Sequence, residues 1–223
     1  MKEKENALQA VRLLMTKLGL TSKEVIDYLS STSSAQTAKV GMYYYAKENI
    51  YSPKPIPGKT ISGIIAYVDP SGHHGLVIGL REERLPWSKE LLWCDHLLPD
   101  DGIKNTQLIM LYAQKYKHNA QAAEWCHSYA YDGISAGNAF LPSSEQWLKI
   151  ISNIADINLA LGKIHKPLLD KFFYWTSSVA EITDYSNSRG HKEQRAETIG
   201  TTTLDTGLTE KNVKEYTRCV ISF

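Results

Sequence analysis

Apolar residues near the start of the chain recur at helical spacing in two short segments. The first predicted helix ends near Leu18, before Gly19, which can turn left-handed, and it carries Ala7, Leu8, Val11, Leu14 and Met15. The second follows residues 21–24, which have capping-box spacing, and carries Val25, Ile26 and Leu29. The pattern predicts a short helical hairpin with an apolar stripe that needs a partner.

A polar segment follows the hairpin. Residues 30–37 are small, polar and aperiodic, which is typical of a linker. We therefore expect residues 1–38 to form the helical hairpin and a Ser/Thr-rich linker, and residues 40–223 to form a second domain.

Beyond residue 40 the pattern first changes to that of a sheet. Residues 42–45, 61–68 and 75–80 are rich in ring and β-branched side chains and are separated by Pro- and Gly-containing turns, which predicts three strands in a meander or hairpin. Two further strands are predicted near the end, at 172–178 and 216–223.

Helical spacing returns between these two groups of strands. It predicts helices over residues 105–116 and 119–129, and a third that begins after Ser143 as N-cap, with Gln146 three residues on and Trp147, Ile150, Ile151 and Ile154 facing inward. Because helices are bracketed by strands and do not alternate with them, the second domain is predicted to be α+β and not a doubly wound parallel sheet.

Composition narrows the function classes. The 223-residue chain is 43% hydrophobic, as in ordinary globular proteins, and its net charge of +1 is too small for general attraction to nucleic acid or anionic lipid. The hairpin's basic residues are interleaved with acids, which disfavours DNA binding. No run approaches the roughly 20 apolar residues of a membrane span, and the N-terminus lacks the apolar core of a secretory signal. We expect neither a nucleic-acid partner nor a membrane span.

Catalytic and metal-binding patterns are weak. His73 and His74 are adjacent, so on a strand their rings would point to opposite faces, and the other His and Cys spacings match no zinc pattern. There is no glycine-rich phosphate loop and no nucleophile elbow. Glu145 is explained by the first turn of a helix, where a carboxylate is favoured. We therefore expect no cofactor, no metal and no catalytic residue.

The polar stretch over residues 181–212 is the candidate binding site. It is too long for an ordinary hairpin, so it is predicted to be a functional or disordered loop. A solvated loop without a partner is the alternative. The candidate residues combine a ring, hydrogen-bonding groups and guanidinium groups of the kind that binding surfaces use: Tyr185, Asn187, Ser188, Arg189, His191 and Arg195.

Several short motifs follow one another in a fixed order from residue 40 to 223. They are the Tyr-rich residues 40–45, the His-Gly turn of 69–76, Asp-Gly at 101–106, Ala-Ala-Glu-Trp-Cys at 122–126, Leu-Pro-Ser at 141–145, Tyr-Trp-Thr-Ser at 174–178 and Arg-Cys-Val at 218–220. This order resembles a bacterial family of C-type-lectin-like domains, which includes C-terminal domains of collagen-like adhesins and surface domains of gut bacteria. One departure lies before Leu141, where the family usually has an aromatic residue followed by Tyr or Arg and this chain offers only Phe140.

The resemblance implies a mostly antiparallel sheet with two or three flanking helices and a non-catalytic recognition or adhesion module. It implies a glycan or protein ligand, in a surface adhesin or phage receptor-binding component. The Glu-Pro-Asn and Gln-Pro-Asp motifs of calcium-dependent sugar binding are absent from the sequence.

Three points stay open in this interpretation. The resemblance makes Cys126 and Cys219 a candidate disulfide, and two reduced buried thiols are the alternative. It also admits an enzyme distantly related to formylglycine-generating oxidases that would use Cys219. The N-terminal helices could join copies of the chain into a homo-oligomer.

Overall fold

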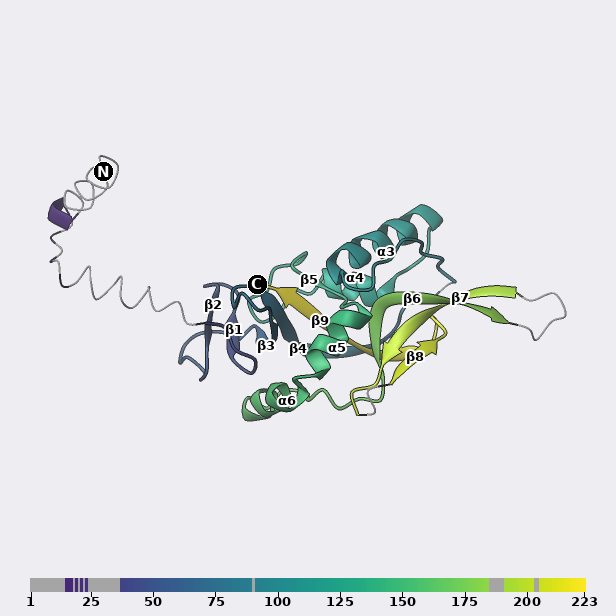
Figure 1. Ribbon diagram of the computed structural model, residues 1–223. Coiled ribbons are helices and arrows are strands. Elements are labelled where there is room, and N and C mark those ends of the chain that lie inside the picture. The colour runs from purple at the N-terminus through teal and green to yellow at the C-terminus, as the bar shows by residue number, and fades with distance from the viewer. Residues whose placement is uncertain are drawn as a thin grey trace. The chain divides into compact units, whose positions relative to one another are not determined.

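The computed structural model describes residues 15–17, 19, 21, 23, 37–89, 91–184, 191–202 and 205–223 (Figure 1). The chain divides into two units, Met1–Thr37 and Ala38–Phe223. In the first unit residues 15–17 are helical and Gly19 has a φ of 66°, as expected for a helix that ends before this glycine. The rest of the expected hairpin and linker lies outside the described residues.

The second unit is an α+β structure built on one mixed, mostly antiparallel open sheet. The strand order is β2-β1-β3-β4-β9-β6-β7-β8, with β5 paired to β9, and the pairing of β6 with β9 is parallel. The strands are β1 (Tyr43–Tyr45), β2 (Ile50–Ser52), β3 (Gly63–Val68), β4 (Gly75–Pro86), β5 (Ala139–Phe140), β6 (Tyr174–Asp184), β7 (His191–Ile199), β8 (Thr206–Thr209) and β9 (Lys214–Ser222).

Helices cover both faces of the central strands. In Figure 1, α3 (Gly102–Tyr116) and α4 (Gln121–His127) lie on one side of the sheet, and α6 (Ile154–Lys163) lies on the other, after α5 (Ser144–Ile151). Alternate strand residues enter two separate cores: Tyr44 and Val77 pack with α3 and α4, whereas Tyr43 and Ile78 pack with α5 and α6. Burial on both faces explains why these strands are continuous apolar runs.

The opening and closing strands of this unit belong to the same sheet. Two strands, β3 and β4, separate β1 from β9. The ring of Phe223, just after β9, lies 6.0 Å from that of Tyr44 and 6.1 Å from that of Tyr51, measured between centroids. The chain ends of the unit therefore meet at one end of the sheet.

The helix predicted after Ser143 is confirmed at its start. Ser143 accepts from the Gln146 backbone N–H, and the Gln146 side chain accepts from the Ser143 N–H, which completes the capping box. The structure ends this helix at Ile151, so Ile154 belongs to α6 and the expectation of one continuous helix is wrong. The Asn153 amide donates to the carbonyls of Lys149 and Ala66 at the break, and so fixes the bend on β3.

The expectation of a long loop over residues 181–212 is wrong for the described part of that stretch. β6 continues to Asp184, β7 begins at His191, and β8 pairs with β7. Buried Ala196 and Thr198 alternate with half-buried Arg195 and Glu197, so the strand has period two but few apolar residues. The short strand β2, next to β1, was also not predicted.

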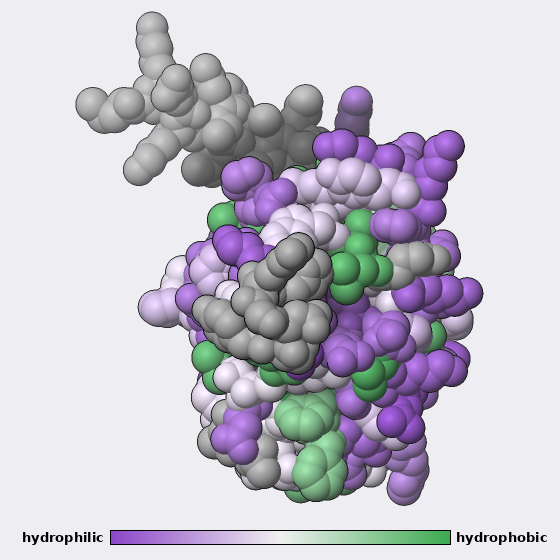
Figure 2. Space-filling model, turned by 90° about the vertical axis from the view of Figure 1, so that its right-hand side faces the viewer, coloured by the Kyte–Doolittle hydropathy of each residue, from purple (hydrophilic) through white to green (hydrophobic). Residues whose placement is uncertain are grey.

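One face of the molecule is mainly polar. Figure 2 shows this face, which is dominated by hydrophilic residues and has separate small hydrophobic patches. Within the described residues, no helix has the length and apolar character needed to cross a bilayer.

Candidate functional site

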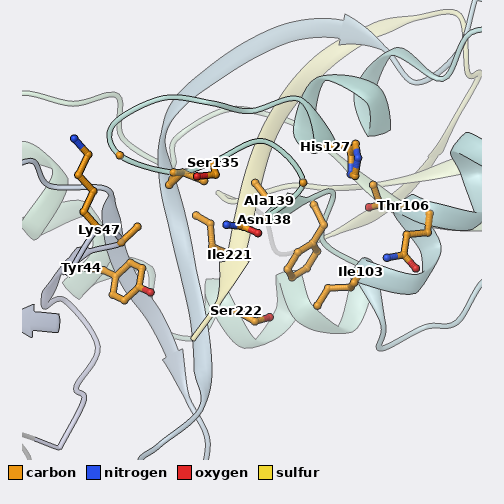
Figure 3. A pocket seen from close by; sticks show the side chains of 16 residues that line it. Tyr44, Lys47, Ile103, Thr106, His127, Ser135, Asn138, Ala139, Ile221 and Ser222 are labelled. Atoms are coloured by element: carbon orange, nitrogen blue, oxygen red, sulfur yellow. The ribbon is translucent and has the colours of Figure 1, made fainter. Parts of the chain in front are cut away.

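A cavity of about 600 Å³ lies at the end of β9, where four separate parts of the chain meet (Figure 3). Its volume is in the range of small-molecule sites. One wall comes from the turn after β1, with Lys47, and another from α3, with Gln107. The end of α4 brings His127, and the segment 131–138 brings Ser135 and Asn138.

The segment 131–138 owes its shape to backbone conformations that the sequence encodes. Asp132, Gly133 and Gly137 have φ values of 54°, 85° and 89°, which Asp and Gly tolerate better than other residues. Ile134 is buried and anchors the middle of the segment. The Gly137 N–H donates to the His127 carbonyl at 2.7 Å, which ties the segment to the end of α4.

An arginine on β4 holds the other end of this segment. The Arg81 guanidinium lies 4.3 Å from the centroid of the Tyr131 ring, and its Nε lies 3.3 Å from Oδ2 of Asp132. Stacking and an ion pair together fix the direction in which the segment leaves α4. The cavity wall is therefore attached at both ends and in the middle.

The floor of the cavity is apolar or already bonded. Phe140 and Ile221 from the paired strands β5 and β9 are buried. The Tyr44 hydroxyl donates to Oδ1 of Asn49 at 2.9 Å. The Thr106 hydroxyl donates to the Gly102 carbonyl at 2.7 Å and accepts from the Leu141 N–H at 3.0 Å. These two polar side chains serve the fold.

The upper walls differ from the floor, because their polar side chains form no hydrogen bonds or ion pairs with the described residues. Among the described residues, none forms a side-chain hydrogen bond or ion pair with Lys47, Gln107, His127, Ser135 or Asn138. In Figure 3 the side chains of Ser135 and Asn138 lie between Lys47 and His127, and the nitrogen end of Lys47 points away from them. The site thus offers amide, hydroxyl and imidazole groups above an apolar base.

The chemistry of this lining fits binding better than metal coordination. The lining contains no aspartate or glutamate, and the described part of the chain brings no three His, Cys, Asp or Glu residues together as possible metal ligands. Calcium requires several oxygen ligands, usually including carboxylates. The arrangement can form hydrogen bonds with a polar ligand and cover one apolar face of it.

Of the binding residues predicted from the sequence, only His191 and Arg195 belong to the described part of the chain, and neither lines this cavity. Tyr185, Asn187, Ser188 and Arg189 lie outside the described residues. His191 begins β7, in the hairpin that extends away from the end of β9 in Figure 1. The Arg195 guanidinium lies 3.4 Å from a Glu193 carboxylate oxygen and 3.8 Å from one of Glu210, so its charge is already paired.

The cysteines are buried and unbridged in this structure. Cys94, Cys126 and Cys219 are free thiols, and those of Cys126 and Cys219 are in hydrogen-bonding contact. Burial, and then the neighbouring Cys126, raise the pKa of Cys219 well above its ordinary value. Burial likewise raises the pKa of Cys94 to about 12. Thiolate chemistry is therefore suppressed at both positions.

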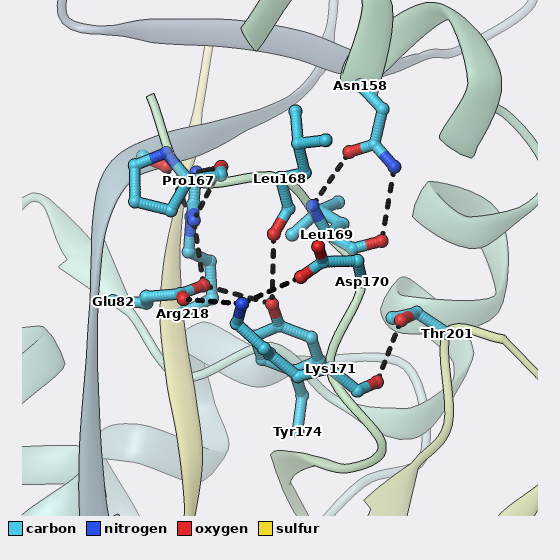
Figure 4. A network of polar contacts seen from close by, with 11 residues as sticks. Glu82, Asn158, Pro167, Leu168, Leu169, Asp170, Lys171, Tyr174, Thr201 and Arg218 are labelled. Carbon is cyan, nitrogen blue, oxygen red and sulfur yellow. Dashed lines mark hydrogen bonds and ion pairs between the residues drawn. The ribbon is translucent and has the colours of Figure 1, made fainter. Parts of the chain in front are cut away.

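A buried polar network farther along β9 was not anticipated from the sequence (Figure 4). The fully buried Arg218 donates from Nε to the Gly79 carbonyl at 2.7 Å and from both terminal nitrogens to the Pro167 carbonyl at 3.2 Å. Its Nη1 lies 3.0 Å from Oε2 of Glu82, which also accepts from the Tyr174 hydroxyl at 2.9 Å. Among the described residues every side-chain nitrogen of Arg218 has a partner, so Arg218 keeps no free donor for a ligand.

Comparisons with known protein families and with curated proteins give no match to this chain. The assignment of a candidate site to this cavity therefore depends on the geometry of the structure alone. The signal in the sequence was the turn-rich segment 131–138, whose Asp-Gly and Gly-Asn pairs indicate turns. Nothing local to that segment identifies Lys47 or Gln107 as its neighbours.

Proposed function

We propose that this chain is a non-catalytic recognition module that binds a glycan or protein ligand in the cavity at the end of β9. The observation that carries the proposal is the set of unbonded polar side chains above an apolar floor. Gln107, Ser135 and Asn138 are exposed and bond to none of the described residues, so their donors and acceptors are available to a ligand that enters the cavity.

We also propose that the second unit is a C-type-lectin-like domain. The order of its motifs supports this, as does the position of β1 and β9 in one sheet with Phe223 against Tyr44. The loops at the end of such a scaffold can vary while the sheet stays fixed. In this proposal the segment 131–138 and the turn after β1 are the ligand-binding loops.

A role for Cys219 in oxidation is the weaker alternative. The residue is fully buried and its raised pKa keeps it a thiol, whereas a reactive cysteine needs thiolate character and access. It also does not line the cavity at the end of β9. These facts favour binding over catalysis.

The N-terminal residues 1–38 would act as the assembling part of the module. Their apolar stripe needs a partner, and a second copy of the same stripe would provide one. Several weak sites held together in a homo-oligomer gain avidity, which suits a surface adhesin or a phage receptor-binding component.

A bulky side chain at the cavity wall tests the binding site. Ser135→Trp places an indole at the lining, and Ala136→Trp places the same ring at the next exposed position, which does not line the cavity. We expect the labelled full chain to bind members of an array of neutral and acidic oligosaccharides and immobilised peptides. Binding should fall at least tenfold in Ser135→Trp and stay within twofold in Ala136→Trp.

Two results would refute this site. Equal binding by the two variants would place the ligand elsewhere on the molecule. Failure of the unmodified chain to bind any glycan or peptide on the array would remove the proposed function itself.

A further inference from the structure

A second cavity adjoins the one at the end of β9. It has a volume of about 590 Å³, and its lining comes from α3, the residues just after α3, and α4. Gln107 and His127 line both cavities and so form their common boundary. Figure 3 shows His127 at the edge of the first cavity that lies opposite Lys47. The ligand class argued below rests on the proposed function, because it assumes that the first cavity is a binding site.

One face of α3 runs along both cavities. Its exposed residues follow one another at spacings of four, four and three positions, which places them on the same side of the helix: Ile103, Gln107, Leu111 and Gln114. Ile103 lines the first cavity, and Leu111 and Gln114 line the second. From Ile103 to Gln114 the helix rises by about 16 Å, which is the length of about five residues of extended chain. This face is therefore long enough for a short extended segment.

Three primary amides along the two cavities have no side-chain hydrogen bond to any described residue. They belong to Gln107, Gln114 and Asn138, and each offers both N–H donors and a carbonyl acceptor. An extended peptide carries free backbone N–H and C=O groups that such amides can bind, whereas the backbone groups of a helix are bonded within the helix. The lining therefore favours an extended peptide over a helical segment.

The apolar part of the lining is aliphatic. Among the described residues, the Phe, Tyr and Trp side chains that line the two cavities are Tyr44 and Phe140, which are 6% and 3% exposed, so neither presents a ring face to a ligand. Leu111 is 59% exposed and Met110 beside it is half-buried. A methionine adapts its shape to an irregular partner, so this pair can accept an apolar side chain.

The second cavity contains one carboxylate, that of Glu124. Its Oε1 accepts a hydrogen bond from the Ala120 backbone N–H at 3.0 Å, and it forms no ion pair with any residue that the structure describes. Glu124 is half-buried, so its charge is screened less than that of a fully exposed carboxylate. This charge favours a ligand with a basic side chain.

We infer that the ligand is an extended peptide segment that lies along α3, with an apolar side chain against Leu111 and a basic side chain at Glu124. Its backbone bonds to the amides of Gln107 and Gln114, and the segment continues into the first cavity to reach Asn138. Successive side chains of an extended chain point to opposite sides, so the residues that face α3 are two positions apart. The site therefore selects a basic and an apolar residue at alternate positions.

The test uses the acetylated and amidated peptide TSKTLTKST, which has the same sequence in both directions and carries a lysine two positions to either side of its leucine. The ¹⁵N-labelled full chain is titrated with it, and the amide shifts of residues 107–114 and 131–138 are followed. We expect saturable shifts in both segments.

Three altered peptides separate the contributions. TSKTSTKST lacks the apolar side chain and should bind at least tenfold more weakly. TSETLTEST reverses the charge and should bind about threefold to fivefold more weakly, as expected for a partly exposed ion pair. Methylation of the backbone nitrogens of the two threonines beside the leucine removes N–H donors and should weaken binding about fivefold.

A matched pair of variants assigns the apolar contact. In Leu111→Ser the leucine and serine peptides should bind alike, because the surface that distinguishes them is gone. Leu148→Ser removes an exposed leucine of α5 that lines neither cavity and should keep the tenfold preference. An unchanged preference in Leu111→Ser would overturn the inference, and so would the absence of saturable binding by TSKTLTKST.

A third variant assigns the charge. Glu124→Gln keeps an oxygen that can accept from the Ala120 N–H and should remove the preference for TSKTLTKST over TSETLTEST. A preference that persists in this variant would show that the basic side chain lies elsewhere, against the inference.

These failures are distinguishable from failure of the proposed function. If TSKTLTKST does not bind but Ser135→Trp still abolishes binding of another ligand on the array, the first cavity stands and its assignment to an extended peptide falls. If TSKTLTKST binds equally well to Ser135→Trp, the peptide does not enter the first cavity and the inference falls. If Ser135→Trp also has no effect on any other ligand, the proposed function falls with it.

Discussion

The strand β9 passes through two polar environments with opposite properties. At Arg218 every polar group has a partner inside the protein, and the side chain is fully buried. Three residues later, Ile221 and Ser222 line a cavity whose other walls carry unbonded amides and a lysine. The same strand thus contributes to a closed network and to an open site. The closed network accounts for stability, and the open one is where a ligand can be accommodated.

Substitutions in the two environments should therefore change the free energy of unfolding by different amounts. A buried charge that loses its partner leaves an uncompensated ion in a low-dielectric interior. An exposed amide that is not bonded to protein is bonded to water and costs little when removed. Substitutions in the two regions therefore separate stability from binding.

The largest effect is expected at Arg218. Arg218→Ala leaves Glu82 without its buried cation and removes the hydrogen bonds to Gly79 and Pro167, and we expect a loss of about 3–5 kcal/mol in the free energy of unfolding. Urea denaturation measures this. Arg84→Ala is the control, since Arg84 is exposed on β4 and should cost below about 1 kcal/mol. A similar small cost for both would show that the network does not stabilise the fold.

A second effect comes from the buried cation Lys211, which forms an ion pair with no carboxylate among the residues that the structure describes. Its Nζ donates to the carbonyls of Leu92 and the Gln194 side chain and lies 4.7 Å from the centre of the Trp87 ring. Burial lowers the pKa of Lys211 to about 8. In the unfolded chain lysine has a pKa of about 10.4, so between these values the unfolded state binds more protons and stability rises with pH.

Two variants isolate this pH dependence. Buried Cys94 and Cys219 act in the opposite direction, because their raised pKa values let the unfolded thiols ionise first. The quantity to measure is therefore the difference in unfolding free energy between the unmodified chain and Lys211→Met. From pH 8 to 9.5 the unfolding free energy of the unmodified chain should rise relative to that of Lys211→Met by up to about 2 kcal/mol. The exposed Lys214→Met should show no such shift, and a flat difference for Lys211→Met would contradict the assigned pKa.

Local sequence signals predicted the helices and the apolar strands of the second unit, but not the strands β2, β5, β7 and β8. The capping box at Ser143 and Gln146 needs only residues three apart, and the structure confirms it. The apolar runs of β1, β3 and the first half of β4 were recognisable because burial on both faces excludes most polar residues. β7 was missed because an outer part of the sheet keeps its period but loses its apolar character, with Glu193, Arg195 and Glu197 on it.

Neither polar region could be predicted from local pattern. Arg218 and its partner Glu82 are 136 residues apart, and an arginine in a strand is usually exposed. The cavity joins Lys47, Gln107 and Asn138, which meet only because β1, α3 and the segment after α4 gather at one end of the sheet. Such sites depend on topology, which short-range periodicity does not specify.

The smallest effect on stability is expected at Asn138, within the cavity itself. Asn138 is exposed, and its side chain bonds to none of the described residues, so Asn138→Ala should change the unfolding free energy by less than about 0.5 kcal/mol. The same variant should weaken any ligand held by the cavity, because a hydrogen bond to that ligand is lost. Urea denaturation and array binding on the same preparation check both. A variant that is as stable as the original chain but binds less places Asn138 in the ligand site, whereas a destabilised variant would show that its amide serves the fold, as Arg218 does.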